Sequence, residues 1–186
     1  MYKPAGMLSQ FSSGEKRQLL KKRFLGECYD FPVGTMPIGR LDEKSEGLLL
    51  LTCQGTLSHA LNSQGVEKEY WVQLDGTIHE VALNKLREGI EIGLFGKRYT
   101  TKPCTAEALK VPPQGLAKPD ALLRVGAHRP TSWIRMVITE GKFRQIRKMT
   151  AAVGFPTARL IRVRIGHHLL DDLQPGQVVP TILTTE

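Results

Sequence analysis

Hydrophobic residues recur along this chain with two different spacings. In residues 66–75 they alternate with polar residues, which is the period of a β-strand with one buried face. In residues 143–153 they recur at positions i, i+3, i+4 and i+7, which predicts an amphipathic helix that ends at Gly154. The fold therefore combines strands and helices that each bury one face. The strand face consists of Tyr70, Val72 and Leu74, and the helix stripe consists of Ile146, Met149, Thr150 and Val153.

Shorter patterns predict the remaining elements. The four leucines at 48–51 lie between two glycines and predict a strand that is buried on both faces. Residues 12–24 predict a capped helix whose inward side chains are Leu19, Leu20 and Phe24. Further predicted elements are a helix over 77–88 ended by Gly89, short strands within 90–111, a long connection over 112–131, and strands over 132–139 and 159–165. Strand pairs interspersed with helices indicate an α+β fold with a largely antiparallel sheet.

The composition is that of a globular protein. Of 186 residues, 41% are hydrophobic and 24% are charged, which suits one ordinary domain with a sizeable core. No hydrophobic run approaches the ~20 residues that span a membrane, and the N-terminus lacks the core of a signal peptide, so we expect no membrane association. The three cysteines are far apart and form no CxxC pair, and the histidines show no metal-ligand spacing. These features argue against disulfides and a metal site and favour a reducing cytoplasm.

Basic residues concentrate in one part of the chain. The net charge is +8. Residues 124–168 contain ten lysine and arginine residues and one acidic residue, Glu140, so this segment carries +9 and the rest of the chain carries −1. Most of the ten are arginine, whose planar guanidinium group suits phosphates and base edges. An evenly spread charge would indicate a solvated surface, whereas this concentration favours a polyanionic partner, and we expect nucleic acid.

The sequence GRLDEKSEGLLLLT at 39–52 surrounds one aspartate, Asp42, with an arginine, two glycines and a leucine run. A loop aspartate commonly caps backbone N–H groups, and that structural role is one interpretation. The other is a carboxylate held at the rim of a cleft by the buried strand that follows, with glycines that let a ligand approach closely. Arg40 would face the same side of an extended segment as Asp42 and suits a phosphate or base contact.

The sequence ITEGKFRQIRKM at 138–149 predicts a strand end followed by a helix with a basic side. An amphipathic helix with a solvated basic face is the plain interpretation. A functional interpretation rests on Gln145 and Arg147, which are rich in donors and lie at a helix start, where anions are favoured. Arginines at a helix start need a further stabilising partner. A carboxylate such as Asp42 would provide one, and the pairing would favour its charged form.

These two segments, together with KEY at 68–70 and the opening KPAG, resemble the RsuA family of ribosomal pseudouridine synthases, in the family's order and over nearly the whole chain. PTSW at 130–133, followed by EGKFRQIRKMTAAVGFPTARLIR, is most similar to the RluE-type members that act on large-subunit ribosomal RNA. The resemblance implies an α+β pseudouridine synthase catalytic fold, with a mixed, mostly antiparallel sheet, flanking helices, two lobes and a central cleft. It also implies that residues 1–186 form one catalytic domain, without the S4-like RNA-binding domain that precedes KPxG in many members.

The resemblance further implies a reaction and a set of site residues. The reaction converts one uridine of ribosomal RNA, which we expect to be 23S RNA, to pseudouridine without a metal or cofactor. Asp42 matches the catalytic aspartate, Tyr70 the tyrosine that stacks on uracil, and Arg147 the arginine that pairs with the aspartate. Arg40 resembles the arginine that fills the vacated base stack. The other expected RNA contacts are Arg144, Lys148, Lys3 and Arg162, and the expected pocket residues are Leu48 and Ile146.

Two other functions fit part of the sequence. A non-catalytic module that binds ribosomal RNA or assists ribosome assembly would explain the basic segment but not Asp42 within GRLD. A glycosidase-like hydrolase would explain a carboxylate at an anomeric carbon, but it usually needs a second carboxylate in a partner motif, and the sequence shows none. We therefore expect a cytoplasmic, monomeric enzyme that modifies ribosomal RNA.

Overall fold

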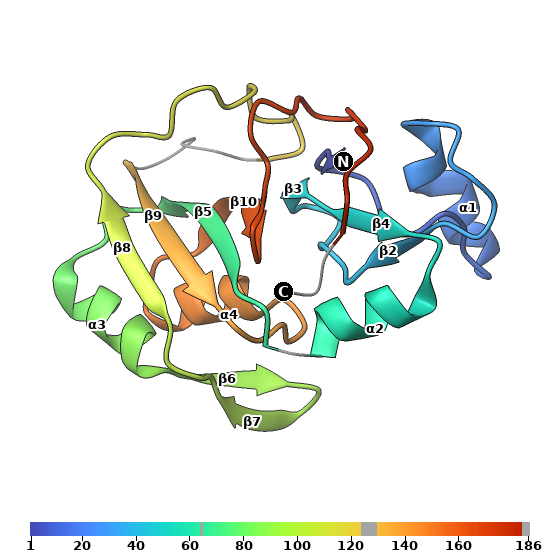
Figure 1. The fold of residues 1–186 in the computed structure, drawn as a ribbon. Helices are drawn as coiled ribbons and strands as arrows, with labels where there is room; N and C mark the ends of the chain where they lie inside the picture. The colour runs from blue at the N-terminus through green and yellow to red at the C-terminus, as the bar shows by residue number, and fades with distance from the viewer. Residues whose placement is uncertain (64, 124–129, 184–186) are drawn as a thin grey trace.

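The computed structural model describes residues 1–63, 65–123 and 130–183. Its centre is a sheet of seven strands among these residues, in the order β1-β3-β10-β5-β9-β8, with β11 paired to β10 (Figure 1). The strands are β1 (Tyr2–Lys3), β3 (Glu46–Leu48), β5 (Lys68–Asp75), β8 (Thr105–Leu109), β9 (Thr131–Ile138), β10 (Thr157–Ile165) and β11 (His168–Leu169). Neighbouring strands are antiparallel except β3 and β10, which are parallel. This mixed, mostly antiparallel sheet confirms the predicted fold class.

Two small two-stranded sheets and four helices complete the described part of the fold. One sheet pairs β2 (Met36–Ile38) with β4 (Leu50–Thr52), and the other is the hairpin of β6 (Glu91–Leu94) and β7 (Lys97–Thr100). The helices are α1 (Lys16–Lys21), α2 (Gly55–Ser63), α3 (Glu80–Glu88) and α4 (Gln145–Ala152), and a 3-10 turn covers Leu25–Glu27. In Figure 1 the β2–β4 sheet, α1 and α2 lie on the right, α3 and β8 lie on the left, and the β6–β7 hairpin lies at the bottom. None of the helices in the described residues is long and apolar enough to cross a bilayer.

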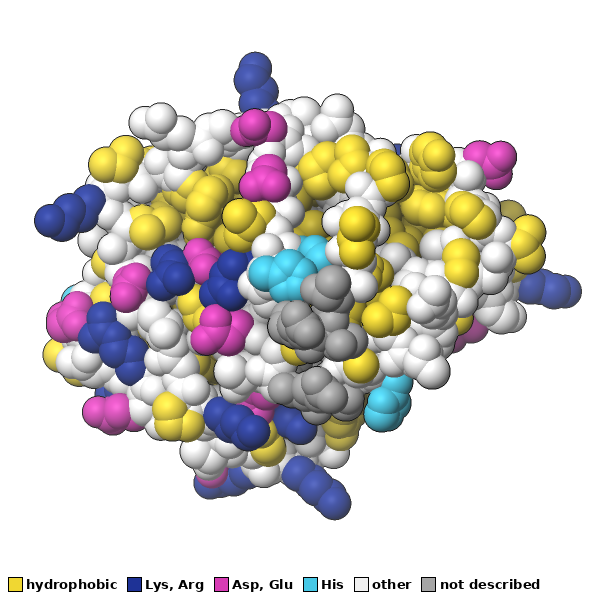
Figure 2. All heavy atoms as spheres, in the orientation of Figure 1, with side chains coloured by type: hydrophobic (Ala, Val, Ile, Leu, Met, Phe, Trp, Pro, Cys, Tyr) yellow, Lys and Arg dark blue, Asp and Glu magenta, His cyan; other side chains and the backbone are white. Residues whose placement is uncertain are grey.

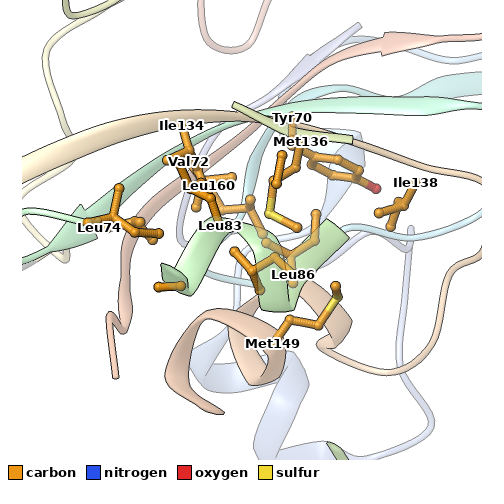
Figure 3. Packing of buried hydrophobic residues seen from close by; sticks show 14 of the residues in the cluster. Tyr70, Val72, Leu74, Leu83, Leu86, Ile134, Met136, Ile138, Met149 and Leu160 are labelled. Carbon is orange, nitrogen blue, oxygen red and sulfur yellow. The ribbon is translucent and has the colours of Figure 1, made fainter. Parts of the chain in front are cut away.

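The largest hydrophobic core lies between the sheet and the helices α3 and α4. Figure 3 shows Leu83 and Leu86 from α3, and Met149 from α4, packed beneath the side chains of the strands. The two periodicities found in the sequence are confirmed, because the predicted strand face and most of the predicted helix stripe are buried here. The buried residues of these two patterns are Tyr70, Val72, Leu74, Ile146, Met149 and Thr150.

The leucine run at 48–51 does not form one strand, and this prediction was wrong. β3 ends at Leu48 in the main sheet, and β4 begins at Leu50 in the two-stranded sheet with β2. Leu49 between them is fully buried, and its N–H donates to the carbonyl oxygen of Met1 at 3.0 Å. An apolar run indicates that a segment is buried but not which strands it pairs with, since the pairing depends on distant partners.

The helix predicted after the two serines forms as α1, but its predicted inward face was wrong. Leu19 is 50% exposed and Leu20 is 86% exposed, and none of the residues of α1 is buried. The helix has only six residues, too few for tertiary packing of one face to dominate. Leu25, which follows the helix, is the residue that enters a hydrophobic cluster near the N-terminus.

β3 approaches β10 closely at Gly47. The φ angle of Gly47 is 106°, and an added Cβ would lie 2.3 Å from the carbonyl oxygen of Arg162. Every other residue would collide with β10, so the parallel pairing requires glycine here. The sequence had suggested that the glycines beside Asp42 admit a ligand. At Gly47 that expectation was wrong, because its close neighbour is the protein's own strand.

Candidate active site

Asp42 lies in a cleft where several distant parts of the chain meet. It belongs to the connection between β2 and β3, whereas Tyr70 comes from β5, and Arg144 precedes α4. All three line the cleft, which has a volume of about 200 Å³. Its other walls come from the segment before Asp42, from the end of α2 and from the loop that follows β9. The fold thus brings together the motifs that the sequence carries far apart.

The Asp42 carboxylate faces two guanidinium groups. Its Oδ2 lies 3.8 Å from Nε of Arg147 and 3.9 Å from Nη1 of Arg144. The Asp42 side chain is 22% exposed, so the carboxylate borders the cleft instead of standing in bulk water. Both distances exceed the length of a hydrogen bond, so charge links the three side chains.

Arg147 is fixed mainly by acceptors of the main chain. Its Nη2 donates to the carbonyl oxygen of Lys44 (2.9 Å) and to Oγ of Ser45 (3.3 Å), and its Nη1 donates to the carbonyl oxygen of Thr157 (3.3 Å). The side chain is 10% exposed. Burial lowers the pKa of Arg147, and the charge of Asp42 opposes this change. Because arginine starts from so high a pKa, Arg147 stays protonated and presents a fixed positive charge to Asp42.

Arg144 reaches the cleft through an unusual backbone conformation. It is the N-cap residue of α4 and has φ 53° and ψ 34°, which is the left-handed region. A non-glycine residue held there costs about 1–3 kcal/mol, and such strain is concentrated at ligand sites. The side chain of Arg144 does not cap the helix, is 42% exposed and lines the cleft. The residue with the strained backbone, Arg144, thus places a guanidinium group at the cleft, where a ligand can reach it.

Tyr70 lies at the junction of the cleft and the core. Its side chain is buried, and Figure 3 shows the ring packed at the edge of the core with its hydroxyl pointing away from Val72 and Leu74. Leu41 and Ile146, which also line the cleft, belong to the same hydrophobic cluster. An aromatic ring in an apolar wall, next to a carboxylate and cations, suits a planar base with a charged backbone. The catalytic roles of Tyr70 and Asp42 stay predictions.

The other predicted contacts occupy varied positions. Arg40 is exposed at the cleft, and Ile146 lines it. Lys148 is not among the residues that line the cleft, and its Nζ donates to the carbonyl oxygen of Gly93 on β6 at 2.6 Å. Leu48 packs in a separate hydrophobic cluster. Its predicted pocket role was wrong, because the leucine run enters the core rather than the cleft wall.

Lys3 and Arg162 were both predicted to contact RNA. Lys3 is fully buried and does not line the cleft, so that prediction was wrong, whereas Arg162 lines the cleft and its contact stays a prediction. Lys3 is 0% exposed, and its Nζ donates to two main-chain carbonyl oxygens at 2.7 Å. Burial lowers the pKa of Lys3 to about 7, against the opposing effect of nearby carboxylates. Arg162 is 2% exposed, and its Nε donates to the carbonyl oxygen of Leu48 at 2.8 Å. Both side chains thus donate hydrogen bonds to main-chain carbonyl groups of the protein.

Carboxylates neutralise part of the basic segment 124–168. Glu69 accepts hydrogen bonds from Arg135 at 2.8 and 3.0 Å and from Arg164 at 3.1 Å. Burial raises the pKa of Glu69, but the hydrogen bonds from the two arginines outweigh this effect and lower it. Arg159 forms a buried ion pair with Glu46. These three arginines stabilise the sheet, and the basic residues that line the cleft from this segment are Lys142, Arg144 and Arg162.

Sequence reasoning missed two charged residues of the cleft. Lys68 lies two positions before Tyr70 on β5, and burial lowers its pKa. The alternation that identified the face of Tyr70 could have identified Lys68 as well. Glu140 accepts hydrogen bonds from Tyr99 on β7 and from Gln145 on α4, and no local pattern indicates so distant a donor as Tyr99. Within the described ranges, no group of three His, Cys, Asp or Glu residues is arranged to hold a metal ion.

Comparisons with known proteins point to one family. Residues 1–152 match the family described as RNA pseudouridylate synthase. The chain is 44% identical over 175 residues to the ribosomal large subunit pseudouridine synthase E of Xanthomonas axonopodis pv. citri, with 93% of this chain and 87% of the relative covered. It is 41% identical over 178 residues to the protein of the same name from Vibrio parahaemolyticus, with 94% of this chain and 69% of the relative covered.

Solved structures agree on the fold. A crystal structure of a pseudouridylate synthase matches with a TM-score of 0.73 at 28% identity, covering 95% of this chain and 66% of that chain. A chain in the structure of an H/ACA RNP bound to a substrate RNA shares the fold at a TM-score of 0.58 and 18% identity, covering 92% of this chain and 48% of that chain. The resemblance seen in the sequence motifs is confirmed by the family match and by the two relatives. This chain belongs to the RNA pseudouridylate synthase family.

Proposed function

We propose that this protein converts a uridine of ribosomal RNA to pseudouridine, and that the target lies in the 23S RNA of the large subunit. The observation that carries the proposal is the Asp42 carboxylate, paired with Arg147 and Arg144 in a cleft that Tyr70 lines. The relatives that share 41% and 44% identity with this chain are named for the large ribosomal subunit, which supports the choice of RNA. Monomeric state and cytoplasmic location stay predictions.

The reaction moves C1′ of one ribose from N1 to C5 of its uracil. The N1–C1′ bond breaks, the freed base turns, the C5–C1′ bond forms, and a proton leaves C5 while N1 gains one. Positive charge develops at C1′ as the base leaves, so an ionised carboxylate beside C1′ stabilises this stage, either through its charge or by bonding to the ribose. In the proposal Asp42 takes this role, and Arg147 supplies the countercharge that holds it in position.

Tyr70 retains the detached base in this proposal. Its ring belongs to an apolar wall, so a uracil stacked on it stays close to C1′ while it turns, and the hydroxyl group serves proton transfer. A uridine inside an RNA stem must first leave its stack, at a cost of a few kcal/mol. Arg40, exposed at the cleft, fills the vacated space, and Arg144 contacts a phosphate.

Replacement of Asp42 by asparagine tests the proposal. We expect Asp42→Asn to slow pseudouridine formation about a hundred- to a thousandfold, because the charge that stabilises C1′ is lost. RNA affinity should stay nearly unchanged, since the substitution keeps the shape of the side chain. The activity is measured as release of tritium from 23S transcripts labelled at C5 of uridine, and the affinity is measured by filter binding.

Glu43→Gln is the matched control for this test. Glu43 is the next carboxylate in the chain, but its partner is Lys22 at 2.9 Å and it does not line the cleft, so activity should persist. A wild-type protein that binds 23S RNA without forming pseudouridine would be a binding module, and release of free uracil would identify a hydrolase. Pseudouridine mapping in ribosomal RNA from cells with and without the gene identifies the target, and a lost site in small-subunit RNA would contradict the 23S assignment.

A further inference from the structure

Two exposed phenylalanines stack on each other beside the cleft. Phe95, at the tip of the β6–β7 hairpin, is 85% exposed, and Phe143, in the loop before α4, is 55% exposed. Their ring centroids are 5.6 Å apart, and their planes form an angle of 28°. Phe95 also has a φ of 49°, a conformation that bulky residues seldom adopt. Large rings grouped in contact with water commonly mark a binding surface.

The hairpin that carries Phe95 is fastened to α4. Lys148 of α4 donates from Nζ to the carbonyl oxygen of Gly93 on β6 at 2.6 Å. Glu140 accepts hydrogen bonds both from Tyr99 on β7 and from Gln145 on α4. These contacts tie both strands of the hairpin to the elements that form the cleft. The stacked rings are therefore preorganised, which lowers the entropy lost when a ligand binds.

Positive charge surrounds the stacked rings and connects them to the cleft. Lys142 and Arg144, the neighbours of Phe143 in the chain, both line the cleft. The ammonium group of Lys148 lies 5.2 Å from the ring centroid of Phe143, and β7 begins with two basic residues. Figure 2 shows lysine and arginine side chains gathered at the lower end of the molecule, where Figure 1 shows the β6–β7 hairpin. The rings thus share one basic surface with the cleft.

We propose that Phe95 and Phe143 form a stacking platform for an unpaired nucleotide that flanks the target uridine. Exposed aromatic rings among cations bind single-stranded RNA, because bases stack on the rings while phosphates meet the charges. Proteins that recognise RNA sequence mostly bind single-stranded loops and bulges. A target uridine in such a region has unpaired neighbours, and the platform holds one of them. This inference rests on the proposed function, because the nucleotide is defined by its position next to the target.

The test removes the ring of Phe95 without straining the backbone. Asparagine tolerates the left-handed region better than most residues, so Phe95→Asn deletes the ring and keeps the turn, while Phe95→Tyr keeps the ring. Leu20→Asn is the matched control, because Leu20 is 86% exposed on α1, away from the hairpin in Figure 1. Binding is measured with a short single-stranded oligouridylate, in an Asp42→Asn background that prevents turnover. KM and kcat are measured with 23S transcripts and an unaltered Asp42.

We expect Phe95→Asn to weaken oligouridylate binding at least about fivefold, which is the lower end of what loss of one base–aromatic stack causes. KM for 23S transcripts should rise by a similar factor with kcat unchanged, because the platform holds RNA but does not touch the reacting atoms. Phe95→Tyr and Leu20→Asn should match the parent in both measurements. Phe143→Ala should repeat the effect of Phe95→Asn on binding.

The outcomes separate this inference from the proposed function. If Phe95→Asn leaves binding and KM unchanged in a protein that forms pseudouridine, the platform is refuted and the function stands. If the parent forms no pseudouridine, the proposed function fails, while the oligouridylate measurement still decides whether the rings bind single-stranded RNA. Self-association that Phe95→Asn abolishes, with RNA binding intact, would assign the rings to contact with a second copy of the chain and refute the platform.

Discussion

Lys3, at the scale of the single residue, makes a pH-dependent contribution to stability. Burial lowers its pKa to about 7, against 10.5 for an ordinary lysine. Between these values the unfolded chain binds more protons than the folded protein, so the free energy of unfolding rises with pH across this window. We expect Lys3→Met to flatten that rise, measured by denaturant unfolding at several pH values. Lys16→Met, at an exposed lysine of α1, should retain the rise, and a Lys3→Met protein with the parent's full pH dependence would contradict the assignment.

Individual residues were predictable where a motif or a periodicity identified them. The motifs identified Asp42 and Arg147, whose charged groups lie 3.8 Å apart, and alternation along β5 identified the face of Tyr70. Lys3 was predicted to contact RNA but is fully buried, because the sequence does not show which distant segments will cover a charge and which carbonyl groups will satisfy it. The chemical roles of the site residues stay predictions until the variants are measured.

At the scale of secondary-structure elements, the pairing of β3 with β10 depends on Gly47. An added Cβ would meet the backbone of Arg162 at 2.3 Å, and the φ of 106° is unfavourable for other residues. We expect Gly47→Ala to lower the free energy of unfolding by on the order of 3 kcal/mol, measured by chemical denaturation. Gly93→Ala on β6 is the control, because an added Cβ there meets open space. Equal stability of the two variants would show that β3 can shift away from β10 at little cost.

Elements with a long, regular pattern were predicted well, and short ones were not. The β5 strand and the α3 and α4 helices lie within a few residues of their predicted bounds, because one buried face determines each of them. The leucine run at 48–51 predicted one strand, whereas the structure has two there, β3 and β4. Local hydrophobicity does not encode the register of these strands with β10 and β2. The α1 helix is too short for its own pattern to fix its orientation.

Over the whole molecule, the charge of the basic segment is divided between sheet and surface. Arg135 is bound to Glu69, whereas Arg144 lines the cleft. Phosphate contacts release counterions, so the logarithm of RNA affinity falls with the logarithm of salt concentration in proportion to their number. We expect Arg144→Gln to reduce this slope by about one and Arg135→Gln to leave it unchanged, measured by filter binding of 23S transcripts over a range of KCl concentrations. Equal changes in slope would mean that Arg135 leaves Glu69 when RNA binds.

The net charge of the sequence predicted the class of partner but not the surface that meets it. Carboxylates from outside the segment, such as Glu46 and Glu69, neutralise several of its arginines, and such pairs form only once the strands are in register. Arg124 and Arg129, which also belong to the segment, lie outside the described residues. The composition therefore overstates the number of cations that line the cleft.

In the two proposals, the β6–β7 hairpin holds RNA, whereas Asp42 acts on the ribose of the target uridine. The strands of the hairpin are anchored through Lys148 and Glu140, while the turn around Phe95 projects from the body. Replacing the turn at residues 94–98 with a different turn would change which RNA sequence next to the target uridine the hairpin binds. The carboxylate of Asp42 would stay in place. Directed evolution confined to this turn is accordingly a practical route to change the target site of a uridine isomerase.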